Sequence, residues 1–128
     1  MIDHVSIGVK DLERSTRLYD AMLSELGYVR MMTREHTVGY GKRYPDLWLN
    51  ARPELVPDGR SGWHVCLRAR TPQAIDAFYA RALAEGATSD GKPGLRPEYH
   101  ETYYAAFVRD FDQNLVEVVT FLGAERGD

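Results

Sequence analysis

An internal repeat of about sixty residues is the feature that most constrains the fold of this chain. Residues 2–26 align with residues 62–86 without a gap. The identical pairs are His4 and His64, Val5 and Val65, Tyr19 and Tyr79, Leu23 and Leu83, and Glu25 and Glu85. In each copy an alternating apolar pattern, typical of a strand, leads into apolar residues at helical spacing. The 128 residues therefore hold about two copies of one unit.

The first copy predicts a strand, a helix and three more strands. Asp11 stands where a helix N-cap is expected, and Gly27 ends the helical pattern. In the first strand His4 lies on the face opposite to the apolar residues, which are expected to pack against the helix. The predicted elements are a strand at 2–9, a helix at about 12–26, and strands at 28–34, 37–42 and 46–51.

The second copy repeats this order after a linker rich in Pro and Gly. Thr71 and Pro72 form a helix start, with a capping side chain followed by Pro at the first helical position. In its first strand Trp63, Val65, Leu67 and Ala69 are expected to face the helix. The predicted elements are a strand at 63–69, a helix from Pro72 that ends at Gly86, a weak strand at 87–89, a turn-rich loop at 90–94, and strands at 102–109 and 115–122.

Each half is thus βαβββ, and the fold class is α+β. Module one covers about 1–51, the linker about 52–61 and module two about 62–122. Neither half is large enough for its own core. We therefore expect one domain over residues 1–128.

The amino-acid composition argues against several classes of function. The 16 Lys and Arg against 19 Asp and Glu, a net charge of −3, disfavour a nucleic-acid partner. No apolar run is long enough for a membrane span, so a cytoplasmic protein is expected. A lone Cys66 forms neither an internal disulfide nor a thiolate cluster, so a metal ion would need His and carboxylate ligands.

Two histidines and a glutamate are the candidate metal ligands. His4 and His64 occupy matching repeat positions on the polar face of their strands. Glu117 lies among large apolar neighbours on one face of the last strand, where a carboxylate favours a nearby cation. Two His and one carboxylate suit a divalent ion such as Zn, Fe, Mn, Ni or Co and leave coordination positions open. The alternatives are structural histidines and an exposed Glu117 at the rim of an edge strand.

Other side chains are candidates for contact with a ligand. Tyr103, Phe107 and Arg109 share one face of the penultimate strand and suit an anionic or aromatic molecule. Alternatively, Tyr103 and Phe107 are core residues and Arg109 is solvated or pairs with Asp110 or Asp112. His100, Trp48 and Cys66 are further lining candidates, and for Cys66 a role as a small buried filler competes with that of a nucleophile.

Three segments carry a family resemblance: residues 2–15, the strand around His64, and residues 104–117 with Glu117. Together they resemble the vicinal oxygen chelate superfamily, which includes glyoxalase I, extradiol dioxygenases, fosfomycin-resistance enzymes and bleomycin-resistance proteins. The resemblance implies a cupped, barrel-like mixed sheet with helices outside, a small-molecule substrate and a homodimer. It places metal ligands at His4, His64 and Glu117.

The fourth ligand position of the family falls within residues 47–49. An alignment of residues 46–49 with 114–117 puts Leu49 there, with Trp48 as the alternative, and neither side chain is a ligand. Classical glyoxalase I activity is therefore not expected. The turn at 110–114 also departs from the family, since it has neither the usual Pro nor the usual Gly.

The sequence thus predicts a metal-dependent enzyme of the glyoxalase or dioxygenase type that chelates vicinal oxygens of a substrate. The reaction would be a lyase or isomerase reaction, an oxygenation or a thiol transfer. The alternative is a non-catalytic protein that binds a small molecule, as bleomycin-resistance proteins do.

Overall fold

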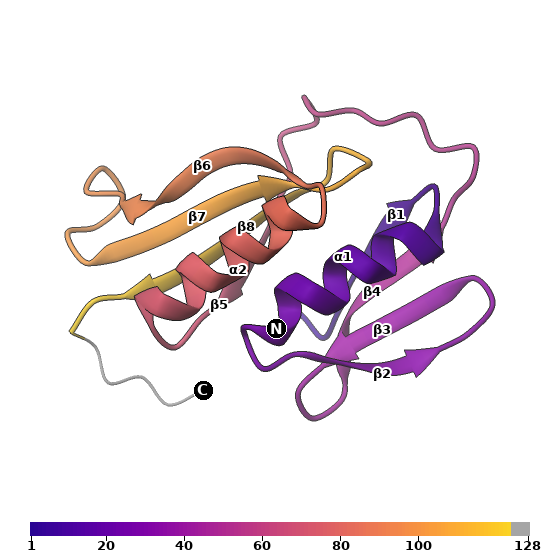
Figure 1. Ribbon diagram of the computed structural model, residues 1–128, viewed down its shortest axis with the longest axis horizontal. Coiled ribbons are helices and arrows are strands. Elements are labelled where there is room, and N and C mark those ends of the chain that lie inside the picture. The colour runs from indigo at the N-terminus through magenta and orange to yellow at the C-terminus, as the bar shows by residue number, and fades with distance from the viewer. Residues whose placement is uncertain (124–128) are drawn as a thin grey trace.

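A computed structural model describes residues 1–123, in which the predicted repeat forms two units of the same topology (Figure 1). The last five residues of the predicted domain, 124–128, lie outside the described part. The first unit contains β1 (Val5–Val9), α1 (Leu12–Ser24), β2 (Val29–Thr33), β3 (Thr37–Gly41) and β4 (Pro45–Ala51). The second contains β5 (Val65–Arg68), α2 (Pro72–Ala84), β6 (Thr88–Leu95), β7 (Tyr103–Arg109) and β8 (Leu115–Phe121).

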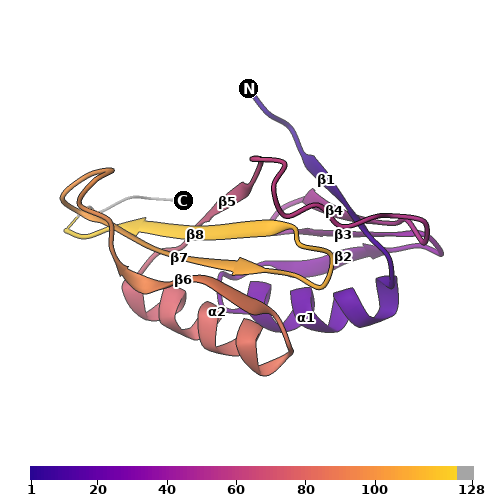
Figure 2. The ribbon, with the colours of Figure 1, turned by 90° about the horizontal axis from the view of Figure 1, so that it is seen from above.

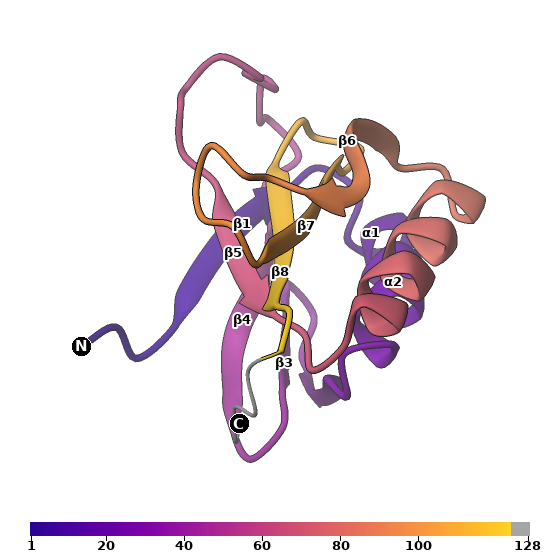
Figure 3. The ribbon, with the colours of Figure 1, turned by 90° about the vertical axis from the view of Figure 1, so that its left-hand side faces the viewer.

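Each unit forms its own four-stranded mixed sheet. The strand orders are β1-β4-β3-β2 and β5-β8-β7-β6, and in both the first strand pairs in parallel with the last. The predicted α+β class and the two βαβββ modules are confirmed, although the sheets do not close into a barrel. Figures 2 and 3 show both helices on one side of the sheets, while the N-terminal residues extend on the other side. We call the side without helices the open face.

Local sequence signals explain where the helices begin and end. The side chain of Asp11 accepts a hydrogen bond from the Arg14 N–H at 3.0 Å, and Thr71 accepts one from the Ala74 N–H at 3.1 Å. Both caps were expected from the sequence. Gly27 and Gly86 follow the helices with φ of 79° and 107°, a backbone region that glycine adopts without steric cost. Neither described helix is long and apolar enough to cross a membrane.

One hydrophobic core joins the two modules. It combines the buried faces of both helices and both sheets, and α1 packs against α2. A polar contact crosses the same boundary: the buried Tyr19 hydroxyl of α1 donates to Asp110 Oδ2 at 2.7 Å. Burial raises the pKa of Tyr19 well above its ordinary value, and the adjacent Asp110 raises it further, so this hydroxyl remains a donor.

We expect Tyr19→Phe to lower the free energy of unfolding by about 1–3 kcal/mol, because Asp110 Oδ2 would lose a donor in a buried site. Tyr79→Phe, at the matching repeat position, is the control. Tyr79 is only partly buried, and its side chain forms no hydrogen bond with the other described residues. Chemical denaturation of both variants measures the difference. An equal loss in the two variants would contradict the assigned role of the Tyr19–Asp110 bond.

The turn between β7 and β8 is held by its own side chains. Asp110 Oδ1 accepts from the backbone N–H groups of Asp112 and Asn114, at 2.8 and 2.9 Å. Gln113 has a φ of 65°, in the left-handed region that residues other than glycine adopt uncommonly. The Asp110 hydrogen bonds therefore fix a turn that the sequence builds without Pro or Gly.

Three sequence predictions need correction. The predicted loop at 90–94 is part of β6, which pairs with β7 through two register shifts; such irregular pairing accommodates the glycines and Pro93. Trp63 was expected to face the helix but is 44% exposed and precedes β5. His4 and His64 likewise lie just before β1 and β5, because ladder pairing begins at Val5 and Val65.

Candidate functional site

A buried carboxylate on the open face of module two is the centre of the candidate site. Glu117, on β8, is 3% exposed, and its Oε1 lies 3.0 Å from Nε2 of His64. His64 has a side chain that is 41% exposed, so the pair is reached from solvent on the histidine side. One nitrogen and one oxygen ligand, with room for further ligands on the solvent side, suit a divalent cation such as Zn²⁺ or Mn²⁺.

Tyr103 fixes the other oxygen of Glu117. β7 pairs with β8 in antiparallel register, and the Tyr103 hydroxyl donates to Glu117 Oε2. Burial, and then this hydrogen bond, raise the pKa of Tyr103 above its ordinary value, so the hydroxyl keeps its proton. One carboxylate oxygen thus faces His64 while the other is held by the sheet.

Cys66 lies on the same face, directly opposite Glu117 in the ladder. Although part of the residue is exposed, burial of its thiol and the nearby Glu117 carboxylate raise the pKa of Cys66 to about 12. The thiolate form is therefore scarce near neutral pH, which disfavours a nucleophilic role.

We expect Cys66 to react with a thiol reagent about a thousandfold more slowly than an unperturbed thiol at pH 8. The pKa of Cys66 is raised from 9.0 to about 12. At a pH below the pKa, each unit by which the pKa rises lowers the thiolate fraction tenfold, and only the thiolate reacts. The rate should rise with pH up to about 12 and recover fully in denaturant. Fast labelling of the folded protein at pH 8 would contradict this assignment.

Of the lining candidates that remain in module two, Phe107 lies beside His64, whereas the contacts of His100 and Arg109 are with other residues. The Phe107 ring is 6.3 Å from that of His64, and the His100 ring is 6.2 Å from that of Phe121 on β8. Arg109 is directed elsewhere: its Nε lies 3.5 Å from Asp90 and its Nη1 donates to the Gln113 carbonyl at 3.0 Å. It therefore pairs with neither Asp110 nor Asp112, the partners considered from the sequence.

Sequence reasoning missed two cations on this face. The Arg68 guanidinium lies 4.9 Å from the Phe121 ring centre, and that of Arg96 lies 5.6 Å from the Phe107 ring centre. The alternation of β5, which puts Arg68 on the same face as His64, was a signal for the first. Arg96 had no such signal, because it follows β6, whose extent was not predicted.

His4 lies apart from this group, just before β1 of the sheet of module one. Its Nδ1 is 2.7 Å from Asp3 Oδ2, and its side chain is 52% exposed. Within the described residues of one chain, no three His, Cys, Asp or Glu side chains are placed to hold a metal ion. The structure therefore brings His64 and Glu117 together and leaves His4 as an exposed group before β1.

The strand register identifies the position in module one that matches Glu117. Cys66 pairs with Glu117 in module two, and Ser6, sixty positions before Cys66, pairs with Trp48 in module one. The matching residue is Trp48, so the alignment that favoured Leu49 was wrong by one residue. A shift of one residue exchanges the faces of a strand: Leu49 is fully buried in the core, whereas Trp48 is on the open face.

Trp48 is accommodated by a glycine on the neighbouring strand. A Cβ added to Gly39 would lie 2.8 Å from Cζ3 of the Trp48 ring and 2.8 Å from Cβ of Pro45. Module one therefore carries an indole packed over Gly39 where module two carries the carboxylate.

We expect Gly39→Ala to lower the free energy of unfolding by about 1–3 kcal/mol, because the added methyl overpacks against the Trp48 ring. Gly8→Ala is the matched control. It lies in the same sheet, and its nearest contact would be Arg52 Cγ at an ordinary 3.4 Å. Tryptophan fluorescence during urea unfolding reports both stability and the indole environment. A Gly39→Ala variant as stable as Gly8→Ala would contradict this packing.

Residues 1–118 match the family model described as Glyoxalase/Bleomycin resistance protein/Dioxygenase superfamily. No curated protein matches the chain. Among solved structures, a glyoxalase/bleomycin resistance protein from Albidiferax ferrireducens is 29% identical, with a TM-score of 0.80, 91% of this chain covered and 95% of that one.

Two more distant structures share the fold alone. A glyoxalase/bleomycin resistance protein/dioxygenase family enzyme from Burkholderia phytofirmans is 19% identical, with a TM-score of 0.71 and coverage of 94% and 98% of the two chains. A mutant of the fosfomycin resistance protein FosX from Listeria monocytogenes is 16% identical, with a TM-score of 0.69 and coverage of 98% and 91%. That structure is a complex with Mn(II) and 1S,2S-dihydroxypropylphosphonic acid.

Proposed function

Because the chain belongs to the Glyoxalase/Bleomycin resistance protein/Dioxygenase superfamily, we propose that it is a metal-dependent enzyme acting on a small oxygen-rich molecule. The observation that carries the proposal is the pair formed by His64 Nε2 and the buried Glu117 carboxylate, 3.0 Å apart. A buried carboxylate facing an imidazole nitrogen is a donor set that fits a divalent cation. The proposed ligands are His4, His64 and Glu117.

A divalent cation bound there would supply the positive charge that stabilises negative charge developing on neighbouring substrate oxygens. The residues of the chain would orient the metal ligands and bind the substrate. Tyr103 holds Glu117 in one orientation, and the Phe107 ring beside His64 provides an apolar wall. Arg68 and Arg96, placed over aromatic rings, favour an anionic substrate. With Cys66 protonated and Trp48 in place of a fourth ligand, neither residue acts as a base.

A second copy of the chain is proposed to complete the site. Within one chain His4 is exposed and apart from the pair, and no helix among the described residues covers the open face. We therefore propose a homodimer in which the partner subunit's His4 reaches His64 and Glu117. The single domain over residues 1–128 and a cytoplasmic location remain part of this proposal.

Subunit mixing tests the shared site. His4→Ala and Glu117→Gln homodimers should each bind metal poorly. Mixing them under exchange conditions should restore tight binding in one of the two sites of the heterodimer. Sizing at micromolar concentration that gives only a 14.6 kDa species, or no recovery in exchanged heterodimers, would contradict the shared site.

Metal content tests the proposal directly. Protein purified without a His tag is compared with His64→Ala by elemental analysis and native mass spectrometry, which also identify the metal and any bound ligand. We expect about one divalent ion per site in the wild type. Equal metal content in both proteins would overturn the proposal.

A non-catalytic small-molecule binding protein is the second candidate. It is favoured by Trp48, which stands where the repeat has Glu117 and offers an indole instead of a ligand. Tight ligand binding that survives chelator treatment, with no turnover, would support this candidate over the enzyme.

A further inference from the structure

A row of paired residues crosses the open face of module two, from the proposed metal site to the outer strand β6. Glu117 of β8 pairs with Phe107 of β7, and Phe107 pairs with Gly91 of β6. Residues that pair across strands point to the same face of the sheet. Because neighbouring strands lie about 4.8 Å apart, the backbone of Gly91 is about 10 Å from that of Glu117, with Phe107 between them.

Gly91 leaves room for the guanidinium of Arg96 at the outer end of this row. A Cβ added to Gly91 would lie 3.1 Å from Arg96 Nη2 and 3.0 Å from Cδ2 of Phe107, so a larger residue would push one of the two aside. The Arg96 guanidinium lies 5.6 Å from the Phe107 ring centre, and the His64 ring lies 6.3 Å from the same ring. The order across the face is therefore His64 with Glu117, then Phe107, then Arg96.

Backbone carbonyl groups of β6 hold the Arg96 guanidinium in place. Its Nη1 donates to the Gly94 carbonyl at 2.9 Å, and its Nη2 donates to the Lys92 carbonyl at 2.7 Å. Both acceptors are uncharged, so these bonds orient the guanidinium without neutralising its charge, and a guanidinium has more N–H donors than the two bonds use. A side chain that is fixed in advance loses little conformational entropy when a ligand binds. Arg96 is thus a fixed positive charge at a set distance from Glu117.

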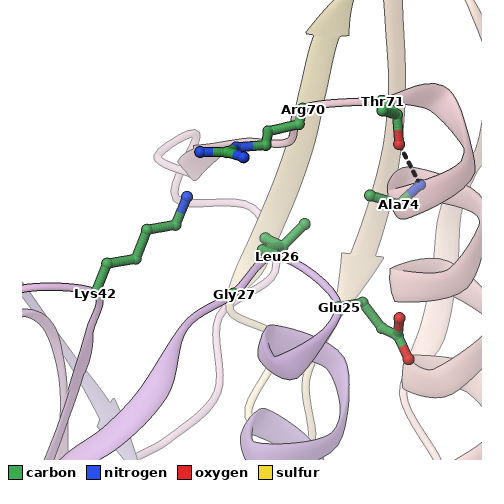
Figure 4. A pocket seen from close by; sticks show the side chains of 7 residues that line it. All are labelled: Glu25, Leu26, Gly27, Lys42, Arg70, Thr71 and Ala74. Carbon is green, nitrogen blue, oxygen red and sulfur yellow. Dashed lines mark hydrogen bonds between the residues drawn. The ribbon is translucent and has the colours of Figure 1, made fainter. Parts of the chain in front are cut away.

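A cavity at the start of α2 also has cationic side chains, but it is separate from this row. It measures about 470 Å³, and Figure 4 shows Lys42 and Arg70 reaching toward it. Both residues have interaction partners, and the Thr71 side chain beside them accepts from the Ala74 N–H at 3.1 Å. None of the residues that line the cavity belongs to the row from Glu117 to Arg96. A molecule held at the proposed metal site would therefore meet Arg96 and not this cavity.

We propose that the substrate has a carboxylate group that binds to Arg96, joined by a flat apolar part over Phe107 to the oxygens held at the metal site. This assignment rests on the proposed function and makes Arg96 a specificity-determining residue. A carboxylate matches the planar guanidinium, which can donate to both of its oxygens. A single negative charge also suits a face that holds one fixed cation and the Glu117 carboxylate, because a second negative charge would be repelled by Glu117. The Phe107 ring stacks on a flat apolar group.

Three chelating probes test the role of Arg96: catechol, 3,4-dihydroxybenzoate and the neutral 3,4-dihydroxybenzamide. Calorimetric titration measures their affinities for the full-length protein loaded with Zn²⁺. We expect the benzoate to bind about tenfold or more tightly than the benzamide, which corresponds to one charge-assisted hydrogen bond. Arg96→Gln should abolish this preference and retain the affinity for catechol. Because the ratio of the two affinities is compared between variants, differences in chelation between the two probes cancel.

Three further variants separate the position of the guanidinium from its charge. Arg96→Lys retains the charge without the planar donor pair and should retain only part of the preference. Gly91→Ala pushes the guanidinium aside and should lower the preference although Arg96 is still present. Arg14→Gln is the matched control, because the Arg14 guanidinium also lies over an aromatic ring, 3.6 Å from the Phe111 ring centre, but outside the row. It should leave the preference unchanged, and circular dichroism confirms that each variant is folded.

The outcomes distinguish the role of Arg96 from the proposed function. If catechol binds only with Zn²⁺ present, but the benzoate preference is equal in the wild type and in Arg96→Gln, the role of Arg96 is overturned and the metal site stands. An equal loss of the preference in Arg14→Gln would reveal a general effect of charge and would also overturn the role of Arg96. Absence of catechol binding, or catechol binding that survives removal of Zn²⁺ or the His64→Ala substitution, would overturn the proposed function and the role of Arg96 with it.

Discussion

Replacing His64 with alanine is expected to weaken the binding of a divalent metal by at least about 100-fold. The variant removes the imidazole nitrogen that faces Glu117 Oε1 at 3.0 Å, and a lost ligand costs at least as much as the loss of a supporting group around a metal site. Glu117→Gln, which retains the size of the side chain and removes its charge, should have an effect of the same order. Competition with a chelating dye, with Zn²⁺ and Mn²⁺ titrated separately, measures both affinities.

His36→Ala is the matched control for these variants. His36 is a histidine of module one with a side chain that is 76% exposed, and among the described residues it pairs with the adjacent Glu35. Its replacement should leave metal affinity unchanged. Circular dichroism confirms that each variant is folded. Metal affinity that is unchanged in both folded His64→Ala and folded Glu117→Gln would overturn the metal site.

Tyr103→Phe is expected to weaken metal binding about 10- to 100-fold without removing a ligand. The Tyr103 hydroxyl donates to Glu117 Oε2, so the carboxylate loses the hydrogen bond that orients it. The same titrations measure the change. A positioning role predicts weaker metal binding with an unchanged number of metal ions per site.

Tyr104→Phe provides the control on the next residue of the same strand. Its hydroxyl also donates to a carboxylate, Asp76 Oδ1 at 2.7 Å, but on the helix side of the sheet. Its loss should affect stability slightly and metal affinity not at all. If both variants weakened metal binding equally, the effect would come from the strand as a whole and not from the orientation of Glu117.

Most of the fold follows from local patterns in the sequence. The helix caps at Asp11 and Thr71, the stops at Gly27 and Gly86, and the repeat itself predicted both modules, because these signals act within a few residues. β6 was predicted as a short strand followed by a loop. Its glycines and Pro93 have poor strand propensity, and only pairing with β7 through two register shifts makes the segment a strand.

The candidate site was predictable in part. The repeat and the alternation of β8 identified His64 and Glu117 as residues of one face, and the structure places them in contact. The module-one residue that corresponds to Glu117 could not be predicted, because alternation along one strand does not determine which residues pair with each other across two strands. The pairing of Ser6 with Trp48 and of Cys66 with Glu117 decided it.

The sequence by itself determined that this protein is two copies of a βαβββ unit with histidines at matching positions. Those properties depend on the periodicity of apolar residues and on residues that are close together in the sequence, so they can be predicted without the tertiary structure. Only the tertiary structure decided that Glu117 is held by Tyr103, that His4 stands apart from His64, and that Lys42 and Arg70 share a cavity. These relations join residues from different strands or modules, and their geometry exists only once the sheets have paired and the two helices have packed together.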